Sequence, residues 1–189
     1  MKLPFTCPQC DQENRENGNF IPSIEQRDII ITNKITYEYT CSKGHQCFYV
    51  LQIERFEMLY KLAIHEFLEN NFRACVINCA AALERFYEFF LQVVFHHNGY
   101  SNERFYEEIW LPIKDRSKRQ EALFKDTFIE LTSIEKPPVI KDTLRKFRNH
   151  IVHQGEFPKK EQTRDFADTI FRIIGIGLHT LHKYCYSSI

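Results

Sequence analysis

From residue 54 onward, apolar side chains recur at the spacing of an α-helix, and this periodicity limits the fold more than any other feature of the chain. In the segment ERFEMLYKLAIHEFLEN, the residues at helical spacing are Phe56, Leu59, Tyr60, Ala63 and Phe67. After Asn70 and Asn71, the stretch FRACVINCAAALERFYEFFLQVVFHH predicts a long second helix at 72–97, which the turn NGYSN ends. Helices with such apolar faces must pack against one another, so this part of the chain is expected to be all α.

The rest of the chain continues this helical pattern. Residues 102–133 predict two shorter helices with Pro112 breaking between them, and the sequence KPP then forces a non-helical joint. The segment VIKDTLRKFRNHIV follows, and a final long helix is predicted at about 161–184. Gly175 and Gly177 weaken that last helix but would allow a neighbouring element to approach it closely. The expected fold is mainly α, a helical bundle over 54–189.

The first 53 residues follow a different pattern and predict a separate small β domain. Two stretches with strand character, RDIIIT at 27–32 and ITYEYT at 35–40, lie between the ligand pairs CPQC and CSKGH. A hairpin would bring these two pairs together, and the tight turns at Pro8 and Gly44 would aim the ligands. This arrangement resembles a zinc ribbon over roughly residues 5–50.

The ligand spacing C-x2-C-x30-C-x3-H predicts that Cys7, Cys10, Cys41 and His45 hold a zinc ion. Cys47 is an alternative fourth ligand, in which case His45 is a surface residue. Four protein ligands leave no open position for substrate, so the zinc is expected to be structural. A segment this short buries too little apolar area to fold alone, which makes the metal its expected source of folding energy.

Composition and charge exclude several classes of protein. Lys plus Arg and Asp plus Glu both total 25, so no net positive charge draws nucleic acid to the chain and any such contact needs a local patch. An apolar run of about 18 residues and the apolar core of a signal peptide are both absent, which predicts a cytoplasmic protein without a membrane contact. Nucleotide-binding glycine motifs, H-E-x-x-H and G-x-S-x-G are also absent.

The segment RNHIVHQG at 148–155 is the strongest candidate for a catalytic site. On a regular helix Asn149 and His153 share a face, whereas Arg148 lies about 140° away from His153. Gly155 at the C′ position predicts that the helix ends just after His153 and leaves the imidazole free of the core. The alternative is that these residues only cap and charge the end of a helix.

The pattern Arg148-Asn149-x3-His153 resembles the Arg-x4-6-His motif of HEPN domains. The pairing of LAIHEFLENNFRACVINCAAALERFYEFF with the later RNHIVH is similar to the first two helices and the motif helix of that family, so the resemblance covers most of residues 55–185. It implies a helical bundle that dimerises and brings two motifs to one cleft. It also matches Glu84 to an acidic position that holds the arginine or histidine, although an exposed carboxylate paired to a nearby cation explains Glu84 equally well.

What the resemblance implies is a metal-independent endoribonuclease of a toxin or antiphage defence system, active on RNA as a homodimer and open to control by an antitoxin or regulatory protein. His153 would move a proton during attack of the ribose 2′-hydroxyl, Arg148 would stabilise the charge on phosphorus, and Asn149 would orient the substrate. Cations for RNA are available in KDRSKR at 114–119 and in a second set, Lys141, Arg145, Lys146 and Arg148. The alternative is a non-catalytic HEPN-like binding or scaffold module that acts with a partner protein.

Overall fold

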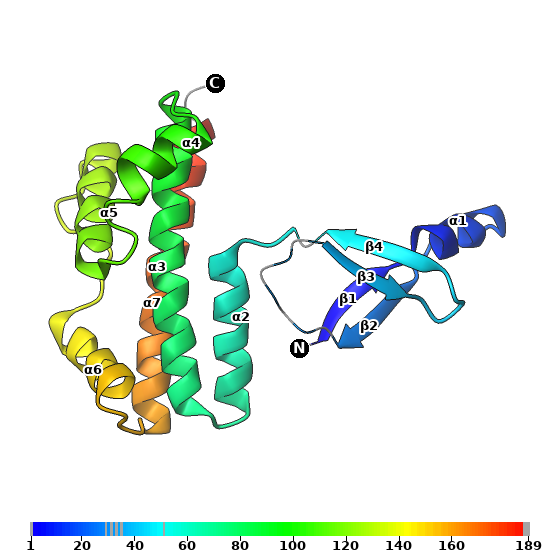
Figure 1. The fold of residues 1–189 in the computed structure, drawn as a ribbon, viewed down its shortest axis with the longest axis horizontal. Coiled ribbons are helices and arrows are strands. Elements are labelled where there is room, and N and C mark those ends of the chain that lie inside the picture. The colour runs from blue at the N-terminus through cyan, green and yellow to red at the C-terminus, as the bar shows by residue number, and fades with distance from the viewer. Residues whose placement is uncertain are drawn as a thin grey trace. The chain divides into compact units, whose positions relative to one another are not determined.

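The computed structural model describes residues 2–28, 30, 32, 34, 36–50 and 52–186. The chain divides into two compact units, Met1–Ile53 and Glu54–Ile189 (Figure 1). The described residues are mainly helical, with two small antiparallel sheets in the first unit. None of the described helices is both long enough and apolar enough to cross a membrane.

The N-terminal unit contains two separate two-stranded sheets. Strand β1 (Lys2–Thr6) pairs with β2 (Ile24–Asp28), and β3 (Thr36–Thr40) pairs with β4 (Gln46–Val50), both antiparallel. The two stretches between the ligand pairs therefore do not form a hairpin with each other in the described residues, and that expectation was wrong. The strand predicted at 27–32 overlaps the end of β2, but positions 29 and 31 lie outside the described residues.

A helix in this unit, α1 (Pro8–Glu16), was not predicted. Proline occupies its first turn, where a missing N–H is tolerated, and Cys7 caps it in an extended conformation. The core of the unit is small. Phe5 is buried between the rings of Tyr39 and Tyr49, at centroid distances of 4.8 and 4.5 Å, and the only other buried cluster among the unit's described residues consists of cysteines.

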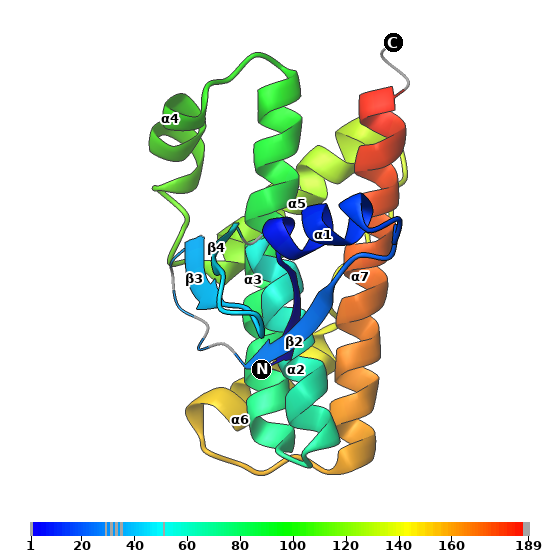
Figure 2. The ribbon, with the colours of Figure 1, turned by 90° about the vertical axis from the view of Figure 1, so that its right-hand side faces the viewer.

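The helical unit is built around α3 (Phe72–His97), the helix predicted with the same bounds. It packs against α2 (Arg55–Leu68), α5 (Ser117–Thr132), α6 (Asp142–His153) and α7 (Lys160–Tyr186). Figures 1 and 2 show α3 and α7 running side by side along most of the unit. The core between these helices is aromatic, and rings of α3 and α5 contact one another within it: Phe86, Phe90, Phe124 and Phe128.

The segment predicted as two shorter helices contains α5 and, before it, a short helical stretch. This stretch starts as α4 (Asn102–Arg104) and continues as a π-helical turn, η1 (Phe105–Trp110), which buries Trp110 against α3. Pro112 lies two residues after the end of η1 and before α5, so the predicted break between the two elements is confirmed. A π-helical turn widens the helix by one residue per turn, a feature that apolar spacing does not reveal.

Candidate functional site

Four side chains from two loops of the N-terminal unit meet in one cluster. Cys7 and Cys10 stand at the start of α1, while Cys41 follows β3 and His45 precedes β4. The turn between the latter two needs Gly44, whose φ of +89° is open to glycine and strained for other residues. The ligand atoms of these four residues all lie within 4.8 Å of one another, so the arrangement is compatible with a metal site.

The distances within the cluster are those of atoms around a common centre. His45 Nδ1 lies 3.6 Å from Cys7 Sγ and 3.4 Å from Cys10 Sγ, and Cys10 Sγ lies 3.7 Å from Cys41 Sγ. The Cys47 thiol is also buried and lies 3.3 Å from Cys7 Sγ, but it is outside the group in which every ligand atom is close to every other. The geometry therefore favours His45 over Cys47 as the fourth ligand.

The thiols of the cluster shift one another's pKa values because they are buried close together. Burial, together with the neighbouring Cys7 and Cys41 thiols, raises the pKa of Cys10 to about 12. Burial also acts to raise the pKa of Cys7, but hydrogen bonds from the Cys10 backbone and from the Cys47 and His45 side chains outweigh it and lower that pKa to about 6. Burial and mutual proximity thus oppose ionisation of these thiols together, and a bound cation would allow several thiolates to form at once.

Two acidic residues that the sequence did not single out hold the ligand loop in place. Glu13 on α1 lies 3.5 Å from His45 Nε2, the nitrogen that faces away from the sulfurs, and accepts a 2.8 Å hydrogen bond from Lys43. Glu25 on β2 accepts hydrogen bonds from both the hydroxyl and the backbone N–H of Ser42, which lower the pKa of its carboxyl to about 2. A carboxylate behind a ligating imidazole is a common means of fixing its tautomer and orientation.

The motif segment forms the last turns of α6, which ends at His153 as predicted. Gly155 follows with φ of +74°, a conformation that ends the helix and turns the chain toward α7. The His153 side chain is exposed, and those of Arg148 and Asn149 are half-buried. Among the described residues, the side chains of Arg148, Asn149 and His153 make no hydrogen bond or ion pair, so their polar groups are available to a ligand.

Helix α6 is attached to the bundle by residues before the motif and by one apolar residue within it. Ile151 is buried in the core, and the Phe147 ring lies 5.8 Å from Phe166 of α7. Arg145 reaches across to α5 and donates a 2.9 Å hydrogen bond to the buried carboxylate of Glu121. This ion pair was not predicted, and it removes Arg145 from the cations that the sequence suggested for gripping phosphate.

Glu84 is half-buried on α3, the helix against which α6 packs. In the part of the chain that the structure describes, it forms no ion pair with Arg148 or His153. The nearby Tyr87 hydroxyl, on the same helix, is buried without a hydrogen-bond partner among the described residues. Burial raises the pKa of Tyr87, and the charges of Glu121 and Glu84 add to that effect. The role of Glu84 in holding the motif stays a prediction.

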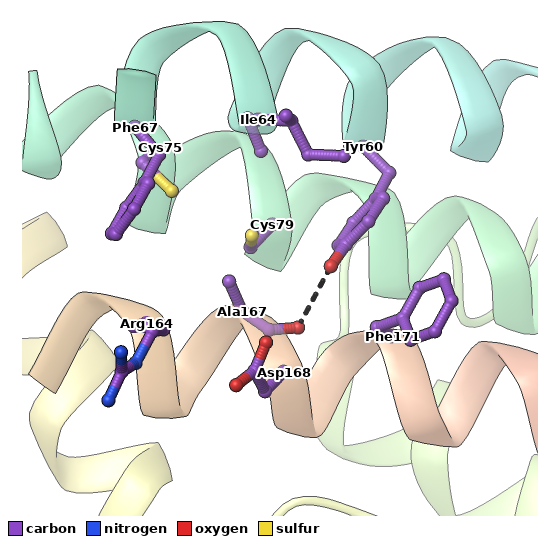
Figure 3. Close-up of a pocket in the computed structure, with 10 residues that line it drawn as sticks. Tyr60, Ile64, Phe67, Cys75, Cys79, Arg164, Ala167, Asp168 and Phe171 are labelled. Carbon is purple, nitrogen blue, oxygen red and sulfur yellow. Dashed lines mark hydrogen bonds between the residues drawn. The ribbon is translucent and has the colours of Figure 1, made fainter. Parts of the chain in front are cut away.

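A cavity of about 390 Å³ lies elsewhere in the helical unit, between α2, α3 and α7 (Figure 3). Cys75 and Cys79 line it and are buried, so they act as small core residues of α3. Tyr60 crosses the cavity and donates a 3.2 Å hydrogen bond to the carbonyl of Ala167. The lining of the cavity is largely apolar and contains none of the residues of the motif at 148–155.

Comparison of the chain with protein-family models, curated proteins and solved structures gave no match. Its function therefore has to be inferred from the chemistry of its residues.

Proposed function

We propose that this protein is a metal-independent endoribonuclease of the HEPN type, with its active site at the C-terminal end of α6. The observation that carries the proposal is the unpaired state of the motif: among the described residues, Arg148 and His153 have no polar partner, yet they end a well-anchored helix. A guanidinium and an imidazole held only to stabilise a helix end would be expected to contact carboxylates or carbonyls.

The chemistry needs two functions that these side chains supply. Neutral His153 removes the proton from the ribose 2′-hydroxyl as its oxygen attacks the adjacent phosphorus, and an imidazolium returns a proton to the leaving 5′-oxygen. Arg148 presents two parallel N–H donors to the phosphate oxygens, whose charge grows in the transition state. The products are a 2′,3′-cyclic phosphate and a 5′-hydroxyl, and no metal takes part in the reaction.

The geometry of α6 favours a homodimer as the active form. Arg148 and His153 lie about 140° apart around the helix, so one copy directs them to different sides. A second copy that faces the first supplies the complementary group to each motif. In this arrangement two cuts per dimer are possible, and a partner protein that separates the copies would act as an antitoxin.

The direct test is cleavage of mixed transfer RNA and a structured RNA by the purified protein in dilute EDTA. Wild type is expected to release fragments that end in 2′,3′-cyclic phosphate, and His153→Ala and Arg148→Ala to release none. His150→Ala is the matched control for His153, because His150 is exposed on the same helix and lies 3.6 Å from Glu156. Arg172→Ala, at an exposed position of α7 outside both sets of candidate RNA-binding cations, controls for loss of one positive charge.

The controls decide between the catalytic and the structural interpretation of the motif. Equal cleavage by wild type and both motif variants would place the nuclease activity elsewhere or in a contaminant, and would end the proposal. RNA binding without cleavage would favour the alternative, a HEPN-like binding module that acts with a partner. Melting temperatures of all four variants should stay near that of wild type, because each substituted residue is exposed or half-buried.

We also infer that the cysteine cluster binds a structural zinc ion through Cys7, Cys10, Cys41 and His45. Zn–S bonds of about 2.3 Å and Zn–N bonds of about 2.0–2.1 Å in a tetrahedron place two sulfurs about 3.8 Å apart and a sulfur and a nitrogen about 3.6 Å apart. The corresponding distances here are 3.7 Å for sulfur to sulfur and 3.4 and 3.6 Å for sulfur to nitrogen.

The zinc proposal predicts one zinc per chain by native mass spectrometry. A strong chelator is expected to unfold the N-terminal unit alone, so amide signals from residues 2–50 collapse in NMR spectra while the helical far-UV signal persists. Cys41→Ser should lose the metal, whereas Cys185→Ser, a change outside the cluster at the end of α7, should keep it. Unchanged spectra after complete zinc removal would contradict a structural role.

A further inference from the structure

The loop that follows the motif displays an aromatic side chain to solvent. Phe157 lies four residues after His153 and is 86% exposed, the highest exposure of any described phenylalanine in the helical unit. Among the described residues its ring makes no aromatic contact. A phenylalanine in this position gives up the stabilisation that burying its ring would bring, and it leaves one aromatic face open to a ligand close to the motif in the sequence.

The backbone on both sides of Phe157 is fixed, so the exposure of its ring belongs to the fold. Pro158 is buried directly after it. The Lys159 backbone N–H donates to Gln162 Oε1 at 3.1 Å, and the Lys159 carbonyl accepts hydrogen bonds from the backbone and the hydroxyl of Thr163 at 3.0 and 2.9 Å. On the other side, Gly155 ends α6. The loop that carries the ring is thus short and is joined at both ends to helices of the bundle.

The surroundings of the ring match a nucleic acid more closely than an apolar protein surface. Lys159 and Lys160 follow within three residues and both are exposed. The neighbouring acid, Glu156, lies 3.6 Å from His150 of α6. Four residues span at most about 14 Å, so Phe157 is within reach of a nucleotide next to a phosphate bound at His153.

We propose that Phe157 stacks on an unpaired base of single-stranded RNA next to the candidate cleavage site, while Lys159 contacts the phosphate backbone. This inference rests on the proposed function and deepens it by naming single-stranded RNA as the substrate class. An aromatic face combined with adjacent cations binds single strands without strong sequence preference, because every base has a face that can stack. In a duplex those faces are covered by neighbouring bases, so paired RNA is a poor ligand at this position.

The test is binding of a fluorescent unstructured RNA oligonucleotide, measured by anisotropy in the cleavage-deficient His153→Ala background. Adding Phe157→Ala is expected to weaken binding about 5- to 150-fold, and Phe157→Trp to retain it. Adding Lys159→Gln should reduce the slope of log affinity against log salt by about 0.7. Phe171→Ala is the matched control, because that ring is 62% exposed on α7 but lies 18 residues after His153. It should leave affinity unchanged.

The outcomes separate this proposal from the proposed function. If wild type cleaves RNA and Phe157→Ala binds the oligonucleotide as tightly as its parent, the stacking proposal is wrong and the nuclease stands. If no RNA is cleaved but binding still depends on Phe157, the nuclease assignment fails and the RNA site stands. If Phe157→Ala shifts the oligomeric state in sedimentation and leaves RNA affinity unchanged, the ring belongs to a protein interface and the stacking proposal is overturned.

Discussion

Two glycines of α7 give a quantitative test of how this helix packs. Gly175 and Gly177 lie two positions apart and face opposite environments. A methyl group added at Gly175 meets no atom within 4 Å, whereas one added at Gly177 lies 2.8 Å from Phe86 Cε1 and closer still to Cζ of the same ring. The perturbation is therefore the pair of single substitutions Gly175→Ala and Gly177→Ala.

Both substitutions gain helix propensity, but only Gly177→Ala introduces a steric overlap. Replacing glycine by alanine inside a helix stabilises the fold by roughly 0.5–1 kcal/mol, because glycine loses more backbone freedom on folding. At 177 the new methyl overlaps Phe86, which is fully buried and in contact with Phe56, Phe90 and Phe124, so it has little room to move. Overpacking of this kind costs roughly 1–3 kcal/mol.

Thermal unfolding followed by far-UV circular dichroism checks this difference. Gly175→Ala is expected to melt about 2–3 °C above wild type and Gly177→Ala a few degrees below it. These values assume that a change of about 1 kcal/mol in unfolding free energy shifts the melting temperature of a unit of this size by about 3 °C. The gap between the two variants isolates the overlap, because the propensity gain cancels. Equal stabilisation by both substitutions would falsify the close packing of α7 on Phe86. A smaller penalty for Gly177→Ala when Phe86→Leu is also present would identify the ring as the cause.

Three further predictions concern the polar contacts of the two units. Glu13→Gln is expected to weaken zinc binding about tenfold, as measured in competition with a chromogenic chelator. This is the low end of the range for residues that contact a metal ligand, because Glu13 is 44% exposed and lies 3.5 Å from His45. Unchanged affinity would show that Glu13 does not orient the imidazole. Arg145→Met should lower the free energy of unfolding of the helical unit by about 3 kcal/mol in denaturant titrations. The substitution leaves the Glu121 carboxylate unpaired with only 11% of its side chain exposed. A loss of stability below about 0.5 kcal/mol, as at ordinary surface sites, would refute this. Native mass spectrometry should find zinc retained in Cys47→Ser and largely lost in His45→Ala, and the reverse result would make the thiol the fourth ligand.

The helices that could be predicted are those with long apolar faces. The bounds of α3 follow from its uninterrupted periodicity between two asparagine-containing turns, and α2 and α7 were placed within a few residues for the same reason. Helix α1 gave no such signal, because Cys10 is its only buried residue. A helix that buries one cysteine of the cluster, and no stripe of apolar residues, cannot be found from periodicity. Pro8 after Cys7 nevertheless marks where α1 starts.

The cysteine cluster was predictable from spacing alone, and the contacts that support it were not. Cys7, Cys10, Cys41 and His45 belong to two short motifs, whose residue types restrict what they can bind. Glu13 contacts His45 only because α1 turns its side chain toward the imidazole, so that prediction needed the helix first. The ion pair between Arg145 and Glu121 could not be predicted either, because it joins residues 24 positions apart and depends on how α5 and α6 pack.

The position of the motif allows the proposed function to be tested separately from stability. Helix α6 is held by its first turns, through Arg145 and Phe147, and by Ile151 near its end. His153 and Phe157 contribute little to that attachment, because both are exposed. Substitutions at these two residues should therefore leave melting temperature nearly unchanged. Any large loss of RNA cleavage or binding that they cause reports on contacts with RNA, whereas loss of activity in an Arg145 variant reports on the attachment of the helix.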